Sequence, residues 1–179
     1  MSGHSKWSQI KHKKGSEDAK RSKLFSQLSR AITLAAREKG TDPALNPSLR
    51  ASIEKAQQVN MPKDTIERAV TKAVSHEDQL SRVLYEAYGP GGVALIIEGI
   101  TDNNNRTFAE IRKILEEHEA KMTPGGAVWA FEKRVDGSCA PTTMVEVNPT
   151  TWAQIEKLVE ALRDHNDVQE VYTNQKNTL

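Results

Sequence analysis

The sequence contains a single cysteine and no long apolar run, and both absences exclude whole classes of protein. Because Cys139 has no possible partner within the chain, an internal disulfide framework is excluded, which fits a reducing compartment. No apolar stretch approaches the roughly 20 residues that a membrane-spanning helix needs. The basic start of the chain is not followed by the apolar core of a secretory signal. We therefore expect a cytoplasmic protein that makes no contact with membranes.

Sequence motifs for catalysis, metal binding and cofactor binding are also missing. One cysteine and five scattered histidines form no cluster with the spacing of metal ligands. The stretch GPGG at residues 89–92 lacks the Lys-Ser/Thr of a phosphate-binding loop and the spacing of a dinucleotide fingerprint, so it is read as a tight hairpin turn. Cys139 and His165 could form a nucleophile and base, but Cys139 lies in a turn-like linker and nothing in the sequence brings the two together. We predict a non-enzymatic protein with no metal and no cofactor.

Charge is distributed unevenly along the chain, although the net charge is only +1. Residues 1–74 carry 15 lysines and arginines against 7 acidic residues, a net charge of +8. Residues 75–179 carry 10 against 17, a net charge of −7. This asymmetry indicates a polyanionic partner for the first half of the chain. The alternative is that two solvated surfaces differ in charge without a functional reason.

The positive charge is densest in the N-terminal basic segment, residues 3–16, with the sequence GHSKWSQIKHKKGS. It contains four lysines, two histidines and one tryptophan, and no acidic residue. Lysines pair with phosphates and release counterions, and a base can stack on the indole of Trp7. A solvated tail is the alternative, but a plain lysine tail would not need a tryptophan. The segment therefore favours nucleic-acid binding, with irregular or single-stranded RNA preferred over duplex DNA.

The first part of the chain is patterned as three amphipathic helices with short connections, which indicates a small helical bundle. The first runs from residue 17 to residue 39 and ends at Gly40, the second begins with Asn46 as N-cap and Pro47, and the third begins at Pro62. Apolar residues at helical spacing predict the buried faces: Leu24, Leu28, Ala31, Ile32, Ala35, Leu49, Ile53, Ala56, Ile66, Ala69, Val70 and Ala73. A basic stripe on the first helix would extend the surface of the N-terminal basic segment: Lys20, Lys23, Arg30 and Arg37.

The second part of the chain is patterned as strands and helices in the order ββα, ββα and a final strand. We expect strands in the stretches 82–88, 93–101, 125–134, 142–149 and 167–173, and helices in 105–120 and 151–165. The residues expected on the inner sides of these helices are Phe108, Ile111, Ile114, Leu115, Trp152, Ile155, Val159 and Leu162. The fold class predicted is α+β, with a mostly antiparallel sheet and both helices on one face. The domains predicted are 1–76, the basic segment with the three-helix domain, and 77–179, the α+β domain.

A polar segment, TDNNNRT at residues 101–107, separates a predicted strand from a predicted helix. Asn105 or a neighbour is expected to cap the helix, and Arg106 falls in its first turn. An arginine at that position opposes the helix dipole. This unfavourable placement indicates a binding role for Arg106, and an ordinary surface loop is the alternative.

Four stretches of the chain closely resemble the YebC family: SGHSKWSQIKHKKGSEDAKRSKLFSQLSRAI, NPSLRASIEKAQQVNMPKDTIERAV, YEAYGPGGVALIIE and TDNNNRT. The resemblance runs from residue 2 to about residue 133 and resumes at TTMVEV. The mitochondrial member of this family is the translational activator of cytochrome c oxidase subunit I. The resemblance implies a cytosolic, non-enzymatic translation factor that engages ribosomal RNA of the large subunit near the peptidyl transferase centre and relieves stalling on proline-rich nascent chains. The RNA-contacting residues it implies are His4, Lys6, Trp7, Lys11, His12, Lys13, Lys14, Lys20, Arg21 and Lys23.

The chain departs from the family pattern at three places. Family members usually carry a third small domain between the strand ending near Lys133 and the strand starting near Thr142, and here only residues 134–141 join the two. Asn104 stands where the family has an arginine, and the segment MTPGGAVWAF differs from the usual one. We therefore expect a short form that lacks the inserted domain. A function that differs from that of the longer family members is an open alternative.

Three functions remain in competition at the level of the sequence. The first is a monomeric translation factor bound to ribosomal RNA. The second is a transcriptional regulator that binds duplex DNA, although no recognition helix with base-reading side chains stands out. The third is a scaffold whose acidic second half binds a protein partner.

Overall fold

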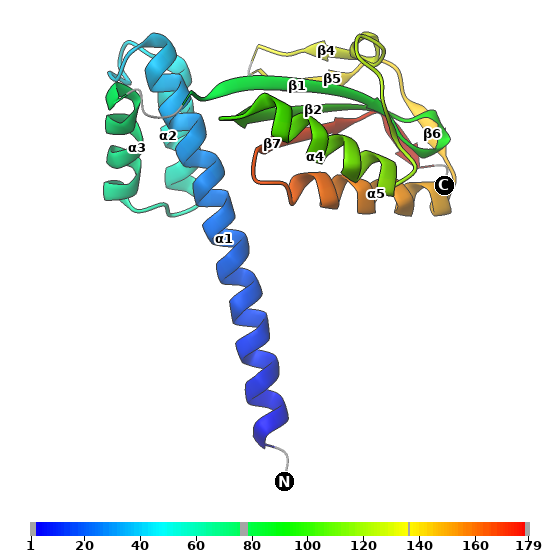
Figure 1. Cartoon of the computed structure of the whole chain (residues 1–179), viewed down its shortest axis with the longest axis horizontal. Coiled ribbons are helices and arrows are strands. Elements are labelled where there is room, and N and C mark those ends of the chain that lie inside the picture. Colours follow the sequence, from blue (N-terminus) through cyan, green and yellow to red (C-terminus); the bar gives the residue numbers. More distant parts are fainter. Residues whose placement is uncertain (1–2, 76–78, 136, 178–179) are drawn as a thin grey trace. The chain divides into compact units, whose positions relative to one another are not determined.

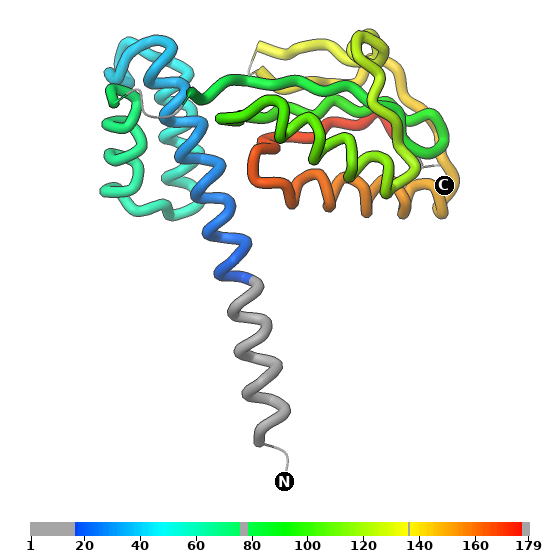
Figure 2. Tube along the Cα trace, in the orientation of Figure 1, coloured from blue at the N-terminus to red at the C-terminus, as the bar shows by residue number. Residues whose placement is uncertain are grey.

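The computed structural model describes residues 17–75, 79–135 and 137–176 with their side chains, and Figure 2 draws in colour the part of the chain that it places. By contact density the chain divides into two compact units, Met1–Glu77 and Asp78–Leu179. Each unit is described by itself. Among the helices of the described residues, none contains an apolar stretch of the length that a membrane span requires.

The N-terminal unit consists of three helices, α1 (Gly3–Lys39), α2 (Pro47–Gln58) and α3 (Lys63–Ser75) (Figure 1). Three helices were expected, but the predicted start of the first at residue 17 is wrong, because α1 begins at Gly3. Helix α1 ends at Gly40, which has a φ of 92° that favours glycine and donates its N–H to the carbonyl of Ala36. Asn46 is fully buried and caps α2 by accepting a hydrogen bond from the Leu49 N–H at 3.0 Å. Its amide also donates to the carbonyls of Ala35 and Gly40, both at 2.8 Å. One buried side chain therefore joins the end of α1 to the start of α2.

Most of the apolar residues predicted to face inward do pack together in this unit. Ile32, Ala35, Leu49, Ala56, Ile66, Ala69 and Ala73 form a buried cluster with Ala36 and Met61. The prediction for Leu24 is wrong, because its side chain is 38% exposed and Phe25 packs against the cluster instead. The third helix begins one residue later than predicted, at Lys63, and the carbonyl of Pro62 accepts from the Thr65 N–H.

The second unit is built on a four-stranded antiparallel sheet in the order β3-β1-β2-β7. Its strands are β1 (Ser81–Tyr88), β2 (Ala94–Thr101), β3 (Lys121–Met122) and β7 (Val168–Thr173). The predicted GPGG turn connects β1 to β2 through a short 3-10 turn, η1 (Pro90–Gly92), in which Gly91 has a φ of 71°. Strand β2 is central and almost wholly buried, so the middle of the sheet is the core of this unit.

Helices α4 (Asn104–Glu117) and α5 (Pro149–Arg163) cover one face of this sheet, which confirms the predicted α+β arrangement (Figure 1). Their N-caps are Asn103 and Asn148, whose side chains accept the N–H groups of Arg106 and Thr151. Leu95 and Ile97 of β2 pack in one cluster with residues of both helices: Ile111, Leu115, Ile155, Leu158, Val159 and Leu162. Phe108 was expected to face inward but is 41% exposed, and its ring packs against that of Tyr85 in an edge arrangement at a centroid distance of 6.1 Å.

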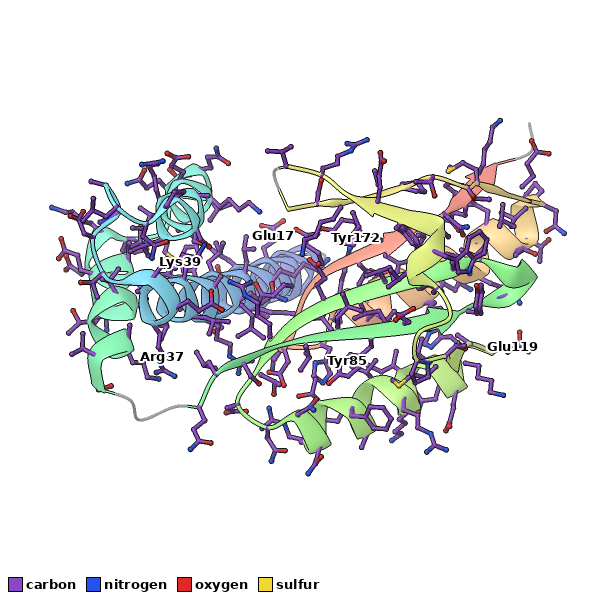
Figure 3. The ribbon with its side chains drawn as sticks, turned by 90° about the horizontal axis from the view of Figure 1, so that it is seen from above. Glu17, Arg37, Lys39, Tyr85, Glu119 and Tyr172 are labelled. Carbon is purple, nitrogen blue, oxygen red and sulfur yellow. The ribbon has the colours of Figure 1, made fainter. Side chains whose placement is uncertain are left out.

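The opposite face of the sheet is covered by a short turn and a two-stranded hairpin: η2 (Val128–Ala130), β4 (Phe131–Lys133) and β5 (Cys139–Pro141) (Figure 1). Ala94, Ile96, Ala127 and Ala130 are buried there, with Phe131, Cys139 and Tyr172 packed against them. Figure 3 labels Tyr85 and Tyr172, which belong to the clusters on opposite faces. Burial, together with Glu98 and Glu170, raises the pKa of Tyr172 to about 12, so its hydroxyl keeps its proton.

The predicted strand over residues 125–134 is wrong for most of its length. Only Phe131–Lys133 is extended and paired, because the N–H groups of Gly125, Ala127 and Val128 bind the carboxylate of Glu86 instead of a neighbouring strand. The linker that was expected to contain Cys139 is strand β5. Strand β6 (Val145–Val147) was predicted, but its parallel partner β8 (Gln175–Asn177) was not.

Candidate nucleic-acid interface

The described part of α1 presents basic side chains of differing accessibility. Lys20 and Arg21 are exposed, whereas Lys23, Arg30 and Arg37 are half-buried. Lys23 lies two positions before Phe25, and Arg30 lies two positions before Ile32. Phe25 and Ile32 both pack in the apolar cluster. Two residues correspond to about 200° around a helix, so these two cations lie on the side of α1 away from α2 and α3. The basic stripe expected from the sequence is therefore compatible with the packing of this unit.

Arg21 is held in place by a neighbouring aromatic ring. Its guanidinium carbon lies 5.2 Å from the centroid of Phe25, one turn further along α1. A guanidinium over an aromatic face is attracted by the ring, and guanidinium N–H groups also bind phosphate oxygens. This contact orients one of the exposed cations before any partner arrives.

The densest group of predicted contact residues lies outside the residues whose side chains the structure describes. This group comprises His4, Lys6, Trp7, Lys11, His12, Lys13 and Lys14. The expectation that they bind nucleic acid is therefore carried by the sequence alone. Lys20, Arg21, Lys23 and Arg30 are the predicted contact residues of the N-terminal unit that can be placed.

Arg106 has a structural reason for its position that the sequence did not reveal. Its Nη2 donates to Asp102 and to Asp167, in each case at 2.8 Å, and its Nε lies 3.8 Å from Glu110. The hydrogen bonds to Asp167 and Asp102 raise the pKa of Arg106 above its usual value. The unfavourable placement at the start of α4 is thus offset within the chain. The inference that this placement needs a binding partner is corrected accordingly.

The segment TDNNNRT is part of a hydrogen-bonded network around the buried carboxylate of Asp167, which is 2% exposed. Thr107 Oγ1 donates to Asp167 Oδ2 at 2.6 Å and lies 2.7 Å from Thr101 Oγ1. The carbonyl of Asp167 accepts from the Ile100 N–H at 2.8 Å. The network therefore ties the end of β2 and the start of α4 to the turn between α5 and β7.

Asp167 also belongs to a cluster of three side chains of the kind that bind metals. This differs from the expectation, based on the sequence, that no such cluster exists. The ligand atoms of Glu110, His165 and Asp167 lie within 4.8 Å of one another. His165 Nδ1 accepts a hydrogen bond from the Asp167 N–H at 3.1 Å. Nε2 therefore carries the ring proton and donates it to Glu110 Oε2, 2.8 Å away. Because Arg106 and Thr107 already occupy the carboxylate of Asp167, these groups satisfy one another, and we assign no metal to them.

Sequence spacing could not reveal this cluster because its members come from distant parts of the chain. His165 and Glu110 are 55 residues apart, and Thr107 and Asp167 are 60 apart. The partners meet because α4 and α5 pack on the same face of the sheet. The run of polar residues in TDNNNRT, between a predicted strand and a predicted helix, indicated a helix cap but not the buried acid that lies opposite it.

Family models match nearly the whole chain. The model described as the TACO1/YebC protein N-terminal domain matches residues 5–76. The model described as the TACO1/YebC second and third domain matches residues 80–135 and 133–175. The first match covers the unit that contains the basic stripe, and the second covers the sheet, its helices and the hairpin.

Relatives of this chain are named as probable transcriptional regulatory proteins. The protein from Petrotoga mobilis is 42% identical over 180 residues, which cover 99% of this chain and 72% of the relative. The protein from Halothermothrix orenii is 47% identical, and the match covers 90% of this chain and 63% of the relative. The chain thus spans about two thirds to three quarters of the length of these relatives.

A solved structure has the same fold. The crystal structure of a conserved hypothetical protein from Aquifex aeolicus superimposes with a TM-score of 0.82 at 29% identity, covering 90% of this chain and 93% of the other. The family models, the relatives and this structure agree. The chain belongs to the TACO1/YebC family, which supports a regulatory role.

Proposed function

We propose that this chain is a non-enzymatic regulatory protein that binds nucleic acid through its N-terminal unit. The observation that supports this most strongly is the density of cations on α1: Lys20 and Arg21 are exposed, and Lys23 and Arg30 lie away from α2 and α3. Lys23 and Arg21 are two residues apart and lie on nearly opposite sides of α1, so the cations surround the helix. The N-terminal basic segment precedes them in the same chain with four more lysines. Phosphates attract such a surface regardless of base sequence, and the released counterions drive binding.

Duplex DNA is the first candidate partner, in the role of a transcriptional regulator. The names of the relatives from Petrotoga mobilis and Halothermothrix orenii support this choice. In this role the protein would prefer a particular promoter fragment over random duplex DNA at physiological salt. The phosphate contacts from α1 would position the protein, and base contacts would supply the preference.

Ribosomal RNA is the second candidate partner, in the role of a cytoplasmic translation factor. It is supported by the combination of lysines with Trp7 in the N-terminal basic segment, because stacking on an aromatic ring suits unpaired bases better than a duplex. In this role the protein would engage the large ribosomal subunit near the peptidyl transferase centre and relieve stalling on proline-rich nascent chains. It would act as a monomer.

We also propose that the chain is a short form of the family that lacks an inserted domain near residues 134–141. The alignment with the relative from Desulfosudis oleivorans extends over 240 residues but covers 97% of a chain of 179. The relative therefore contains a long stretch that has no counterpart here. The matches to the second family model meet at residues 133–135, and there the hairpin from β4 to β5 takes the place of an insert.

Sedimentation of cell extract through a sucrose gradient at low salt separates the two partners. A translation factor is expected to comigrate with ribosomes or the large subunit at low salt and to dissociate from them at moderate salt. A competition assay on the full chain then compares large-subunit RNA with promoter fragments and random duplex DNA. A promoter fragment bound far more tightly than random duplex and RNA would establish the transcriptional role. If the full chain binds neither RNA nor DNA at low salt, the proposed function is wrong.

A further inference from the structure

Trp129 is an exposed aromatic residue whose polar group is already satisfied within the chain. Its side chain is 63% exposed, at η2 on the hairpin side of the sheet. The indole Nε1 donates to the Tyr88 hydroxyl at 2.9 Å, and that hydroxyl donates to the carbonyl of Gly126 at 2.7 Å. A partner therefore has no hydrogen bond to make with the indole N–H, and the exposed ring surface is what remains to be bound.

The loop that carries Trp129 is held in one conformation by a carboxylate. Glu86 Oε2 accepts the N–H groups of Ala127 and Val128 at 2.7 and 2.8 Å, and Oε1 accepts that of Gly125 at 3.1 Å. The carbonyl of Glu86 also accepts from the Thr123 N–H at 2.8 Å. An exposed ring on a fixed loop loses little conformational freedom on binding, which favours recognition.

The surroundings of Trp129 include an exposed cation, although its unit, residues 78–179, carries 10 basic and 16 acidic residues, a net charge of −6. Five of these acidic residues lie on α4 and α5, which cover the other face of the sheet: Glu110, Glu116, Glu117, Glu156 and Glu160. Glu98 and Glu170 lie on the hairpin side near Tyr172, and Glu98 is 3.9 Å from the Nζ of Lys133. Lys121 is exposed and directly opposite Tyr88 in the register of β1 and β3. Directly opposite residues share one face of a sheet, so Lys121 offers a cation to a phosphate near the ring.

We propose that Trp129 is a second contact for nucleic acid, a platform on which an unpaired base stacks while the N-terminal unit holds the backbone. This inference rests on the proposed function with RNA as the partner, in which the cations of the N-terminal unit bind the phosphates. Stacking on a fixed aromatic ring accepts any base and needs no hydrogen bond to it. Bases paired in a duplex are not available to such a platform, so it selects single-stranded nucleic acid.

Fluorescence of a single tryptophan tests this contact directly. The full chain with Trp7→Phe and Trp152→Phe retains Trp129 as its sole tryptophan. Addition of single-stranded oligouridylate is expected to quench its emission, and an RNA duplex of the same length is expected to quench it much less. A matched chain with Trp7→Phe and Trp129→Phe reports Trp152, which packs against the core and should not respond.

Affinity measurements supply the second test. Trp129→Ala is expected to weaken binding of single-stranded RNA on the order of tenfold, with an unchanged dependence on salt. Trp129→Phe keeps a ring and is expected to retain most of the affinity. Because Trp129 is largely exposed, circular dichroism and thermal unfolding should show both variants folded.

The two proposals fail in different ways. If single-stranded RNA binds the chain but neither quenches Trp129 nor binds Trp129→Ala more weakly, the platform is refuted and the proposed function stands. Equal quenching by the duplex also refutes it. If no nucleic acid binds the chain at all, the proposed function itself is refuted.

Discussion

Asp167 is a buried acid whose hydrogen bonds join several elements of the second unit. Its carboxylate is 2% exposed and accepts from Arg106 and Thr107, while its backbone binds Ile100 and His165. Asp102 binds the same Nη2 atom of Arg106 at the same distance, but its side chain is 44% exposed. The two acids therefore form a matched pair that differs in burial.

Replacement of Asp167 by asparagine is expected to lower the free energy of unfolding by about 2–4 kcal/mol, because a buried charge-assisted network loses its charge. Asp102→Asn, the control, should change it by less than about 1 kcal/mol, as is usual for exposed ion pairs. Urea denaturation measures both. Equal effects of the two substitutions would show that the network does not stabilise the unit.

Glu86 predicts a response to acid. Burial alone would raise the pKa of Glu86, but the N–H groups of Ala127, Val128 and Gly125 together lower it below the ordinary 4.5. Since the folded-state pKa lies below the unfolded one, the carboxylate stabilises the fold above about pH 4.5, and this contribution disappears as the pH falls through the folded-state value.

Acid is therefore expected to loosen the loop that carries Trp129 before the rest of the unit unfolds. The substitution Glu86→Gln should loosen the same loop at neutral pH. The emission of the chain with Trp129 as sole tryptophan, recorded between pH 7 and pH 3, follows this change. In Glu86→Gln the acid transition of that emission should be weakened. A transition of unchanged size would mean that another group controls the loop.

At the scale of elements, strand β2 depends on a close approach of two backbones. The ladder between β2 and β7 shifts register between Glu98 and Gly99. A Cβ at Gly99 would lie 2.8 Å from the carbonyl oxygen of Asp167 and 2.9 Å from Val83 Cγ2. Only glycine allows this carbonyl to reach the Ile100 N–H at 2.8 Å.

Gly99→Ala is therefore expected to destabilise the second unit by about 2–3 kcal/mol through overpacking against backbone. Gly92→Ala is the control, because its Cβ would meet nothing within 4 Å and only its φ of +75° is unfavourable. That strain costs about 1 kcal/mol. Thermal unfolding that ranks Gly92→Ala as the more damaging substitution would contradict this description of the β2–β7 contact.

The elements that could be predicted from the sequence are those with local signals. The cap Asn46 and the stop at Gly40 mark helices, and GPGG marks the turn between two strands. Asn148, which caps α5, was instead assigned to the end of the preceding strand. The short strands β5 and β8 have three residues each and depend on partners far along the chain. Glu86 binding the loop before Trp129 is likewise a contact across about 40 residues that no local pattern predicts.

The residues of the candidate site likewise fall into those with a local signal in the sequence and those that depend on distant partners. The cations of α1 were predictable because charge and helical spacing are local, whereas the role of Arg106 was not, because Asp167 is 61 positions away. The platform at Trp129 was missed because its segment was read as a strand. Its signal in the sequence was an aromatic residue after two glycines, which was interpreted as an apolar strand position.

At the scale of the whole molecule, two units of opposite net charge are joined in one chain, +7 for residues 1–77 and −6 for residues 78–179. We expect the basic unit to supply the salt-dependent part of nucleic-acid binding and the acidic unit to contribute little to it. A set of charge-matched variants can separate the two contributions. Lys20, Arg21 and Lys23 changed to alanine remove three cations from α1, and Arg112, Lys113 and Lys157 changed to alanine remove three from α4 and α5.

The most direct test of the central claim is the salt dependence of nucleic-acid affinity for the full chain and these two triple variants. The slope of log affinity against log salt should fall by about 2–3 in magnitude for the α1 variant, since each phosphate contact contributes about 0.7–0.9. The variant of α4 and α5 should keep the slope of the unaltered chain. Equal slopes in all three proteins, or a loss confined to the α4 and α5 variant, would contradict a nucleic-acid interface on the N-terminal unit.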